Sequence, residues 1–472
     1  MKNHRSSPRG PDSIDIDTLR PPFAPTDAAV EWLFRLQRLG IRPGLDAIRE
    51  LLESMGRPDR AFPCVVIAGT NGKGGAATAL AAFCRAAGLR TGLYTSPHLL
   101  DVRERIVVDG VPIPAQELFG LVSRHRDRIE RTRTTFFEST TALALEYFAR
   151  CGVDVAVLEA GLGGRLDATN AVRKEAVVLT SIGRDHEELL GGSLESIARE
   201  KLGLATPETP FYLHELDDSS IQALAERVLD RVGAERIAVG ELTGLSTGDD
   251  ELRGLGTDGA LQRRQVRSML AVYRDLAGRR GWPETSLEGA LPSLRLPGRY
   301  DTWGHRPRLR LDTAHNEPAL RTTLRQWGDE GSRDTRVLVF GASQGKSIDG
   351  AFGDVAASAR TVLVTAPHWY RARSAPELAV AIRRAADERG LEIEIAVEGT
   401  VRATLEEARR RARAMPADGP APSVLVLGSH FLVAEALDRL GIDDLRQENR
   451  TPLWDEDLPL RQRTAGSTEA VV

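Results

Sequence analysis

Residues 65–75 read VVIAGTNGKGG, a short apolar run that leads directly into a glycine-rich loop. The alanine-rich stretch from Gly75 to Ala87 predicts a helix, and Gly88 is a suitable residue to end it. A loop between a strand and a helix presents backbone N–H groups and the positive end of the helix dipole to an anion. Lys73 adds a positive charge. We therefore predict a phosphate-binding loop, with an ordinary glycine-rich turn as the alternative.

The loop departs from the usual P-loop pattern. In that pattern six residues, the first of them a glycine, precede the lysine, and a Ser or Thr follows it. Position 67 is Ile and position 74 is Gly, so this loop is shorter and lacks that hydroxyl. A magnesium ion normally takes a ligand from the hydroxyl. We expect any magnesium ion here to find its protein oxygens elsewhere.

Further apolar runs on both sides of the loop predict an α/β fold. Strands without clean alternation, separated by helical stretches, are typical of a parallel sheet that is covered on both faces. Helices are expected in 26–55, with a break at Pro43-Gly44, and in 140–150. The expected strands are Val65–Ala68, Thr91–Thr95, Val153–Glu159 and Ala176–Ser181, then Arg308–Leu311, Val337–Phe340, Val362–Thr365, Glu392–Val397 and Val424–Gly428.

The two groups of strands predict two domains, as the length of 472 residues also suggests. We expect an ATP-binding domain over 26–292 and a smaller Rossmann-like α/β domain over 298–445. Residues 241–260 read as a loop or short excursion. Polar composition predicts a disordered leader over 1–25 and a disordered tail over 447–472.

Composition limits the classes of function. A net charge of −4 argues against general nucleic-acid binding, and no apolar run approaches the length that spans a bilayer. The three cysteines, Cys64, Cys84 and Cys151, are expected as buried free thiols. A reducing compartment, the cytoplasm, follows as an expectation.

Several motifs together resemble the folylpolyglutamate and dihydrofolate synthases, members of the Mur ligase superfamily. The loop Gly69–Gly74 closely resembles the loop of that family. The other matching blocks follow in the right order: Leu39–Leu45, Tyr94–Leu99, Arg103–Ile106, Glu159–Asn170, Thr180–His186 with Glu200-Lys201, Leu296–Arg299, Asp312–Asn316 and, more weakly, Gly428-Ser429. The resemblance implies a Mur-ligase-like fold with a P-loop ATPase domain followed by the smaller domain.

The resemblance also implies a reaction and its cofactors, ATP and Mg²⁺. ATP would phosphorylate the carboxylate of a folate or of dihydropteroate, and the amine of L-glutamate would attack the acyl phosphate and form an amide. Catalysis of this kind depends mainly on positioning and charge neutralisation. The family expectation is a monomer that has small-molecule substrates and no nucleic-acid or membrane partner.

Family positions carry over residue by residue. The implied catalytic residues are Lys73, Glu159, His186 and Lys201, and the lysine at the last of these positions is often carbamylated in the family. The implied metal ligands are Ser96 and Glu159 for a first magnesium ion, and His186 and Glu159 for a second. The implied nucleotide contacts are Gly69, Thr70, Asn71, Gly72, Lys73, Gly74, Gly75, Gln262, Arg299, Asp312 and His315. Taken without the resemblance, Ser96 reads as a turn residue, His186 as a structural histidine and Asp312 as a helix N-cap.

Three positions depart from the family pattern. The family normally has Ser where this chain has Gly75, and a His-Gln pair followed by Asn where it has Leu261, Gln262 and Gln265, so that only Gln262 matches. Restoring the hydroxyl at position 75 is expected to keep or raise activity. The departures allow three interpretations: an ordinary synthase, a Mur-like amide ligase for another carboxylic acid, or a nucleotide-binding homologue without turnover.

Overall fold

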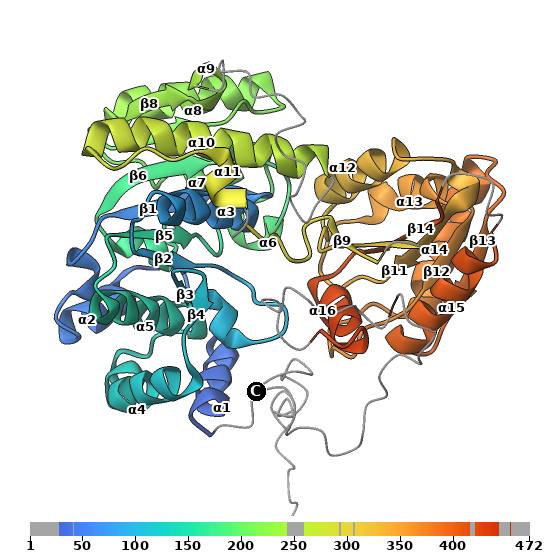
Figure 1. The fold of residues 1–472 in the computed structure, drawn as a ribbon, viewed down its shortest axis with the longest axis horizontal. Coiled ribbons are helices and arrows are strands. Elements are labelled where there is room, and N and C mark those ends of the chain that lie inside the picture. The colour runs from blue at the N-terminus through green and yellow to red at the C-terminus, as the bar shows by residue number, and fades with distance from the viewer. Residues whose placement is uncertain are drawn as a thin grey trace, which may run out of the picture.

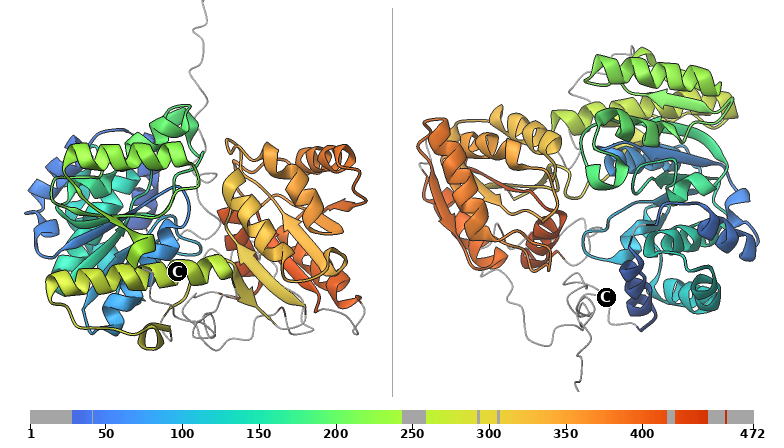
Figure 2. Two further views of the ribbon diagram at one scale, coloured as in Figure 1. Left: turned by 90° about the horizontal axis from the view of Figure 1, so that it is seen from above. Right: turned by 180° about the vertical axis from the view of Figure 1, so that it is seen from behind.

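The computed structural model describes residues 28–40, 42–242, 259–291, 294–304, 307–415, 421–442 and Trp454. In these ranges the chain builds two sheets that form two separate bodies (Figures 1 and 2). The first sheet is eight-stranded in the order β4-β3-β2-β5-β1-β6-β7-β8. The second is six-stranded in the order β13-β12-β11-β14-β10-β9.

The first sheet is parallel except at one edge. Its strands are β1 (Cys64–Ala68), β2 (Thr91–Tyr94), β3 (Ile106–Val108), β4 (Val111–Pro112), β5 (Val155–Glu159), β6 (Lys174–Leu179), β7 (Pro210–Leu213) and β8 (Glu235–Ala238). The antiparallel pairs are β2 with β3 and β3 with β4. The expectation of a parallel sheet is thus right for its centre and wrong at this edge, where a short hairpin turns back along β2.

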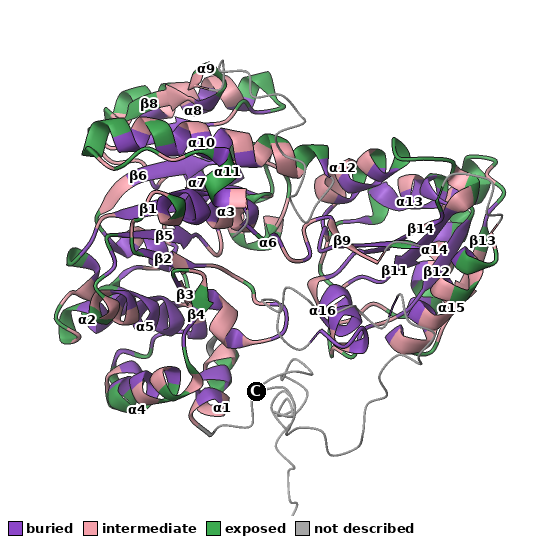
Figure 3. Cartoon of the chain, in the orientation of Figure 1, coloured by how far each residue is buried: buried purple, intermediate pink, exposed green. Residues whose placement is uncertain are grey.

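Helices cover both faces of the first sheet, which explains why β1 shows no polar alternation. Cys64, Val66 and Ala68 pack into one apolar core, whereas Val65 and Ile67 pack into the other. Strand β1 is accordingly buried along its whole length (Figure 3). The helices of this body are α1 (Ala28–Arg35), α2 (Asp46–Ser54), α3 (Lys73–Ala86), α4 (Ala115–Thr132), α5 (Phe136–Cys151), α6 (Glu187–Leu190), α7 (Leu194–Leu202), α8 (Ser219–Val232), α9 (Val239–Leu242), α10 (Ala260–Arg280) and α11 (Leu287–Ala290).

The second sheet is parallel except for its edge strand β9, which pairs antiparallel with β10. Its strands are β9 (Asp301–Trp303), β10 (Arg308–Asp312), β11 (Arg336–Phe340), β12 (Thr361–Val364), β13 (Glu394–Val397) and β14 (Ser423–Leu427). Its helices are α12 (Glu317–Gly328), α13 (Phe352–Ser358), α14 (Ala375–Glu388), α15 (Val401–Arg413) and α16 (His430–Arg439). Every strand expected from the sequence is present, either in the first sheet or in the second.

Some expectations fail or lie outside the described residues. The expected leader, 1–25, lies outside them, and so do 243–258, the centre of the expected loop over 241–260. The ends of that expected loop are helical, because α9 includes 241–242 and α10 starts at 260. In the expected disordered tail only Trp454 is described. It is fully buried and donates a hydrogen bond to the Pro307 carbonyl (2.7 Å), unlike a disordered residue. The domain boundaries stay predictions.

Two other expectations are that the cysteines are buried free thiols and that no segment spans a bilayer. All three cysteines are free, and Cys64 and Cys84 are buried, but Cys151 is only partly buried at the end of α5. Among the described residues, no helix is both long and apolar enough to cross a bilayer.

The parallel strands bring distant segments to a common edge. The loop after β1, Glu159 at the end of β5 and Thr180-Ser181 after β6 all lie at carboxyl ends of neighbouring strands. In open α/β sheets, ligands bind at this edge. In the second body Asp312 likewise ends β10.

Candidate active site

The glycine-rich loop is held in shape by the segment that follows β6. Thr70 N–H donates to the Ser181 carbonyl (2.9 Å), and Asn71 N–H donates to Ser181 Oγ (2.9 Å). Thr180 Oγ1 donates to the Asn71 carbonyl (2.7 Å). Gly69 has a φ of +147°, and a Cβ on it would lie 2.0 Å from Thr180 Oγ1. Glycine at position 69 is therefore required both by the backbone conformation and by the approach of Thr180.

Two lysines converge on one carbonyl of this loop. Lys73 Nζ donates to the carbonyls of Gly69 (3.0 Å) and Thr70 (3.2 Å), and Lys201 Nζ, from α7, donates to that of Gly69 (3.0 Å). Burial lowers the pKa of Lys73, and burial together with Lys73 lowers the pKa of Lys201 to about 7. Two amines held this close at the start of α3 form a site that favours an anion.

Glu159 supplies a buried carboxylate beside the loop. It is 3% exposed and accepts a hydrogen bond from the Ser96 N–H (2.9 Å). Burial raises its pKa although Lys73 and Arg299 attract the charged form. Ser96, Glu159 and His186 line one small cavity of about 140 Å³, together with residues 69–74, Lys201 and His315.

The second body reaches this cavity through a cluster of polar side chains. Lys346 Nζ lies 2.8 Å from Asp185 Oδ1 and 3.2 Å from His186 Nε2. Asn316 caps α12 and also donates to Asn71 (2.9 Å) and to Asp185 (3.0 Å). Although burial opposes it, attraction to Lys346 and His186 lowers the pKa of Asp185. Burial and Lys346 lower the pKa of His186 to about 4.

Sequence reasoning missed Lys346. It follows β11 in the glycine-containing segment 341–346, which leaves the carboxyl end of a parallel strand as the 69–73 loop does. That similarity of position is the signal that could have identified it.

The expected nucleotide contacts of the second body divide into two groups. Arg299 and His315 line the small cavity, and Arg299 also donates to Thr313 Oγ1. Asp312 lies outside both of the main cavities, and it accepts N–H bonds from Tyr300 and Ala314 (both 2.8 Å). Asp312 is not the cap of α12, which is Asn316, so its structural role is to hold the backbone at positions 300 and 314.

The residues of α10 at the positions of the family's His-Gln pair and Asn make different contacts. Gln262 lies outside both main cavities, and Gln326 of α12 donates to its side-chain oxygen (3.4 Å). Gln326 also accepts the Leu261 N–H (3.1 Å), so the first turn of α10 contacts the second body (Figure 1). Gln265, by contrast, reaches the loop and donates to the Gly72 carbonyl (2.7 Å).

The donor set near Glu159 fits a hard divalent cation only in part. Magnesium favours oxygen ligands and keeps several waters, and the Glu159 carboxylate and Ser96 hydroxyl can supply two such oxygens. The described residues contain no group of three or more His, Cys, Asp or Glu side chains gathered for a metal ion. Beside His186 the Lys346 ammonium occupies the position of a cation. The first expected metal site therefore fits better than the second.

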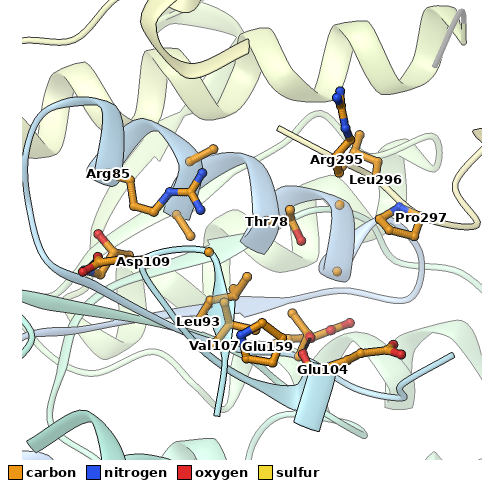
Figure 4. Close-up of a pocket in the computed structure, with 18 of the residues that line it drawn as sticks. Thr78, Arg85, Leu93, Glu104, Val107, Asp109, Glu159, Arg295, Leu296 and Pro297 are labelled. Carbon is orange, nitrogen blue, oxygen red and sulfur yellow. Dashed lines mark hydrogen bonds between the residues drawn. The ribbon is translucent and has the colours of Figure 1, made fainter. Parts of the chain in front are cut away.

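A much larger cavity, of about 960 Å³, adjoins the small one (Figure 4). Gly74, Glu159, Arg299 and His430 line both cavities. The larger one follows α3 past Thr78 to Arg85, with Leu93 and Val107 of the sheet opposite. Its walls are thus mainly apolar along the middle and charged at both ends.

The comparisons with known proteins agree with this geometry. Residues 67–234 match the Mur ligase middle domain. The chain is 35% identical over 442 residues to a probable bifunctional folylpolyglutamate synthase/dihydropteroate synthase of Haloferax volcanii, which covers 86% of this chain and 50% of that one. The chain thus spans about half the length of this relative. It is 31% identical over 379 residues to a dihydrofolate synthase/folylpolyglutamate synthase of Mycobacterium tuberculosis, covering 72% of this chain and 78% of that one.

Solved structures show the same fold. E. coli FolC in complex with DHPP and ADP superimposes with a TM-score of 0.72 at 26% identity, covering 88% of this chain and 97% of that one. A bifunctional folylpolyglutamate synthase/dihydrofolate synthase from Yersinia pestis, complexed with AMPPNP and a Mn ion, gives 0.71 at 28%, covering 88% and 98%. The chain belongs to the folylpolyglutamate synthase/dihydrofolate synthase family of Mur-ligase-type proteins.

Proposed function

We propose that this protein is an ATP-dependent ligase that adds L-glutamate to a folate, to dihydropteroate, or to both through an acyl phosphate. The observation that carries the proposal is the junction at Gly74 and Glu159, where a small polar cavity meets a long, largely apolar one. The E. coli relative holds DHPP and ADP, and the Yersinia relative holds AMPPNP and a Mn ion.

The small cavity takes the phosphates of ATP. Lys73 and the N–H groups that start α3 surround the terminal phosphates, and their positive charge offsets the negative charge of the phosphates. Glu159 and Ser96 hold a divalent cation, for which we propose Mg²⁺, with His186 beside them. The ion supplies charge neutralisation between phosphate oxygens.

The large cavity takes the acceptor acid. Helix α3 has 14 residues and is therefore about 21 Å long, so the groove beside it suits an elongated acid whose carboxylate lies at the junction. The carboxylate oxygen attacks the terminal phosphorus and ADP leaves. The amine of glutamate then attacks the acyl carbon, the C–N bond forms and the C–O bond to phosphate breaks. Arg299 lies where negative charge develops in both steps.

A ligase for a different carboxylic acid is the second candidate. The observation that favours it is the altered loop and α10, where Gly75, Leu261 and Gln265 differ from the family pattern. A nucleotide-binding homologue without turnover is less well supported, because Lys73, Lys201, Glu159 and Ser96 remain gathered around one small cavity.

We first predict acceptor-dependent ATP turnover. Purified protein with ATP, magnesium and glutamate should release ADP and phosphate only when dihydropteroate or tetrahydrofolate is present, and the product should be one glutamyl unit heavier. A coupled assay measures the release of phosphate, and mass spectrometry measures the mass of the product. Turnover with another acid but with neither pterin would favour the second candidate, and no turnover with any acid would contradict the ligase.

We predict that Glu159→Gln lowers ligation by at least about 100-fold, because the amide removes the negative charge that holds the cation. The amide oxygen can still accept the Ser96 N–H, and the buried carboxylate is destabilised as its raised pKa indicates. The melting temperature without ligands should therefore not fall. Glu195→Gln, at an exposed ion pair with Arg199, is the control and should leave ligation unchanged. Ligation by Glu159→Gln at the rate of the control would contradict the metal site.

We predict that Lys201 is carbamylated in the active protein. Because its pKa is about 7, a large fraction of the amine is neutral at pH 8 and can add CO₂ with release of one proton. Depletion of CO₂ should lower activity, and bicarbonate should restore it more fully at pH 8 than at pH 6. Labelling with ¹³CO₂ should give a carbamate resonance in NMR that is absent in Lys201→Met. A resonance that persists in this variant would place the carbamate elsewhere.

We predict that Thr78→Phe blocks the acceptor groove. Thr78 lines the large cavity but not the small one, so the ring should fill acceptor space and leave the phosphate site open (Figure 4). The KM for the acceptor should rise more than about tenfold, while the Kd for AMPPNP changes less than about twofold. Thr78→Ser is the matched control. An unchanged acceptor KM in the folded Phe variant would show that the acid binds elsewhere.

A further inference from the structure

Gln265 of α10 lies across the outer side of the phosphate loop. Its Nε2 donates to the carbonyl of Gly72, the residue that caps the start of α3, at 2.7 Å. Helix α10 is fixed against α3 by buried apolar side chains, among them Val266 and Met269 beside Ala76 and Leu80. The helix pair thus fixes the backbone of Gln265 beside the loop, and the bond to the Gly72 carbonyl holds its side chain there.

The space for this amide depends on glycine at two positions. A Cβ on Gly75 would lie 2.4 Å from Gln265 Oε1, and a Cβ on Gly72 would lie 2.6 Å from its Nε2. Real Cβ atoms do not approach other heavy atoms this closely, so either addition would displace Gln265. The two glycines differ in one respect. Gly72 has a φ of +84°, which already favours glycine, whereas Gly75 lies within helix α3 and has no such φ.

The glycine at 75 is therefore explained by space and not by backbone conformation. Any residue can adopt the helical conformation at this position, and glycine is a costly choice inside a helix, by roughly 0.5–1 kcal/mol relative to alanine. Gln265 fills the volume into which a side chain at 75 would extend. It also supplies a polar group to the loop, from a different helix, at the place where residue 75 has none.

We propose that Gly75 and Gln265 form a matched pair in which Gln265 is a positioning residue for the phosphate loop. Its bond to the Gly72 carbonyl orients the N–H groups that start α3. A serine at 75 requires either a shorter residue at 265 or movement of the Gln265 amide away from the Gly72 carbonyl. The proposal rests on nucleotide binding at this loop, as in the proposed function.

A four-member cycle tests the pair: the natural protein, Gly75→Ser, Gln265→Asn and Gly75→Ser/Gln265→Asn. Binding of AMPPNP with magnesium is measured by calorimetry, and the KM for ATP and kcat are measured with the acceptor that supports turnover. Gly75→Ser should weaken AMPPNP binding by about tenfold or more, because the hydroxymethyl group displaces the amide. Gln265→Asn should weaken it by about fivefold through loss of one hydrogen bond.

The double variant decides the inference. It should bind AMPPNP more tightly than Gly75→Ser alone, because the shorter Asn side chain leaves room for the hydroxymethyl group. The losses should appear in the KM for ATP and not in kcat, a division that general destabilisation would not give. Because Gly75 also lines the large cavity, the acceptor KM of the serine variants reports on that cavity separately. Additive losses in the folded variants would overturn the pair.

Two controls separate the possible failures. Gly278→Ser, on the same helix α10 with nothing within 4 Å of its Cβ position, should leave AMPPNP binding unchanged. If Gly75→Ser does not fold, Gly75→Ala and Gly75→Ala/Gln265→Asn replace the serine variants, with the same expected recovery. If the natural protein binds no AMPPNP, the proposed function fails. If it binds AMPPNP but the cycle is additive, only the pair fails.

Discussion

The convergence of two lysines on the Gly69 carbonyl governs the rest of the site. Lys201 is buried and Lys73 is half-buried, and the loop around them is fixed by Thr180 and Ser181 and by the left-handed glycines. Burial lowers the pKa of both lysines and raises that of Glu159, so each charged form is destabilised in the free protein. A nucleotide with its cation brings both the negative and the positive charges that these groups need. The site is therefore better suited to the loaded state than to the free one.

The second body contacts the phosphate loop through hydrogen bonds, while Leu99 and Leu100 of the first body pack into an apolar core of the second. Asn316 donates to Asn71 of the phosphate loop and to Asp185, and Lys346 forms an ion pair with Asp185. Lys346 occupies a cationic position beside His186, where the family pattern places a metal ion. Ligand binding at the loop would compete for these same groups, and closure of the two bodies is thus linked chemically to the contents of the small cavity.

Much of the architecture could be predicted from sequence because the central strands are buried on both faces. Their continuous apolar runs, such as 65–68, and the glycine loop that follows β1 leave few alternatives to a parallel sheet. The hairpin of β3 and β4 could not be predicted, because strands of two or three residues carry no periodic pattern. The burial of Trp454 also escaped, since a single aromatic residue in a charged segment gives no sign of the core it joins.

The site residues show the same division. Residues 69–74, Ser96, Glu159, His186 and Lys201 meet in one cavity because strand ends meet, which a strand assignment makes foreseeable. Gln262 and Asp312 do not line it, because their side chains are engaged by Gln326 and by backbone N–H groups that no motif reveals. Lys346 depends on how the two bodies approach each other, and a sequence does not give that geometry.

The departures at positions 75 and 265 illustrate how the surrounding structure bears on a conclusion drawn from a single position. Read separately, Gly75 is a lost hydroxyl and Gln265 is an amide with extra reach, and restoring serine is expected to be harmless. In the structure the longer side chain occupies the space beside the bare glycine, and its oxygen lies within 2.4 Å of the position that a Cβ would take. A serine at 75 would therefore have to move the Gln265 amide, a cost that the interpretation of position 75 alone leaves out. The same pair also bears on the acceptor, because a change that is compensated within the nucleotide loop gives no reason to assume a different acid in the large cavity.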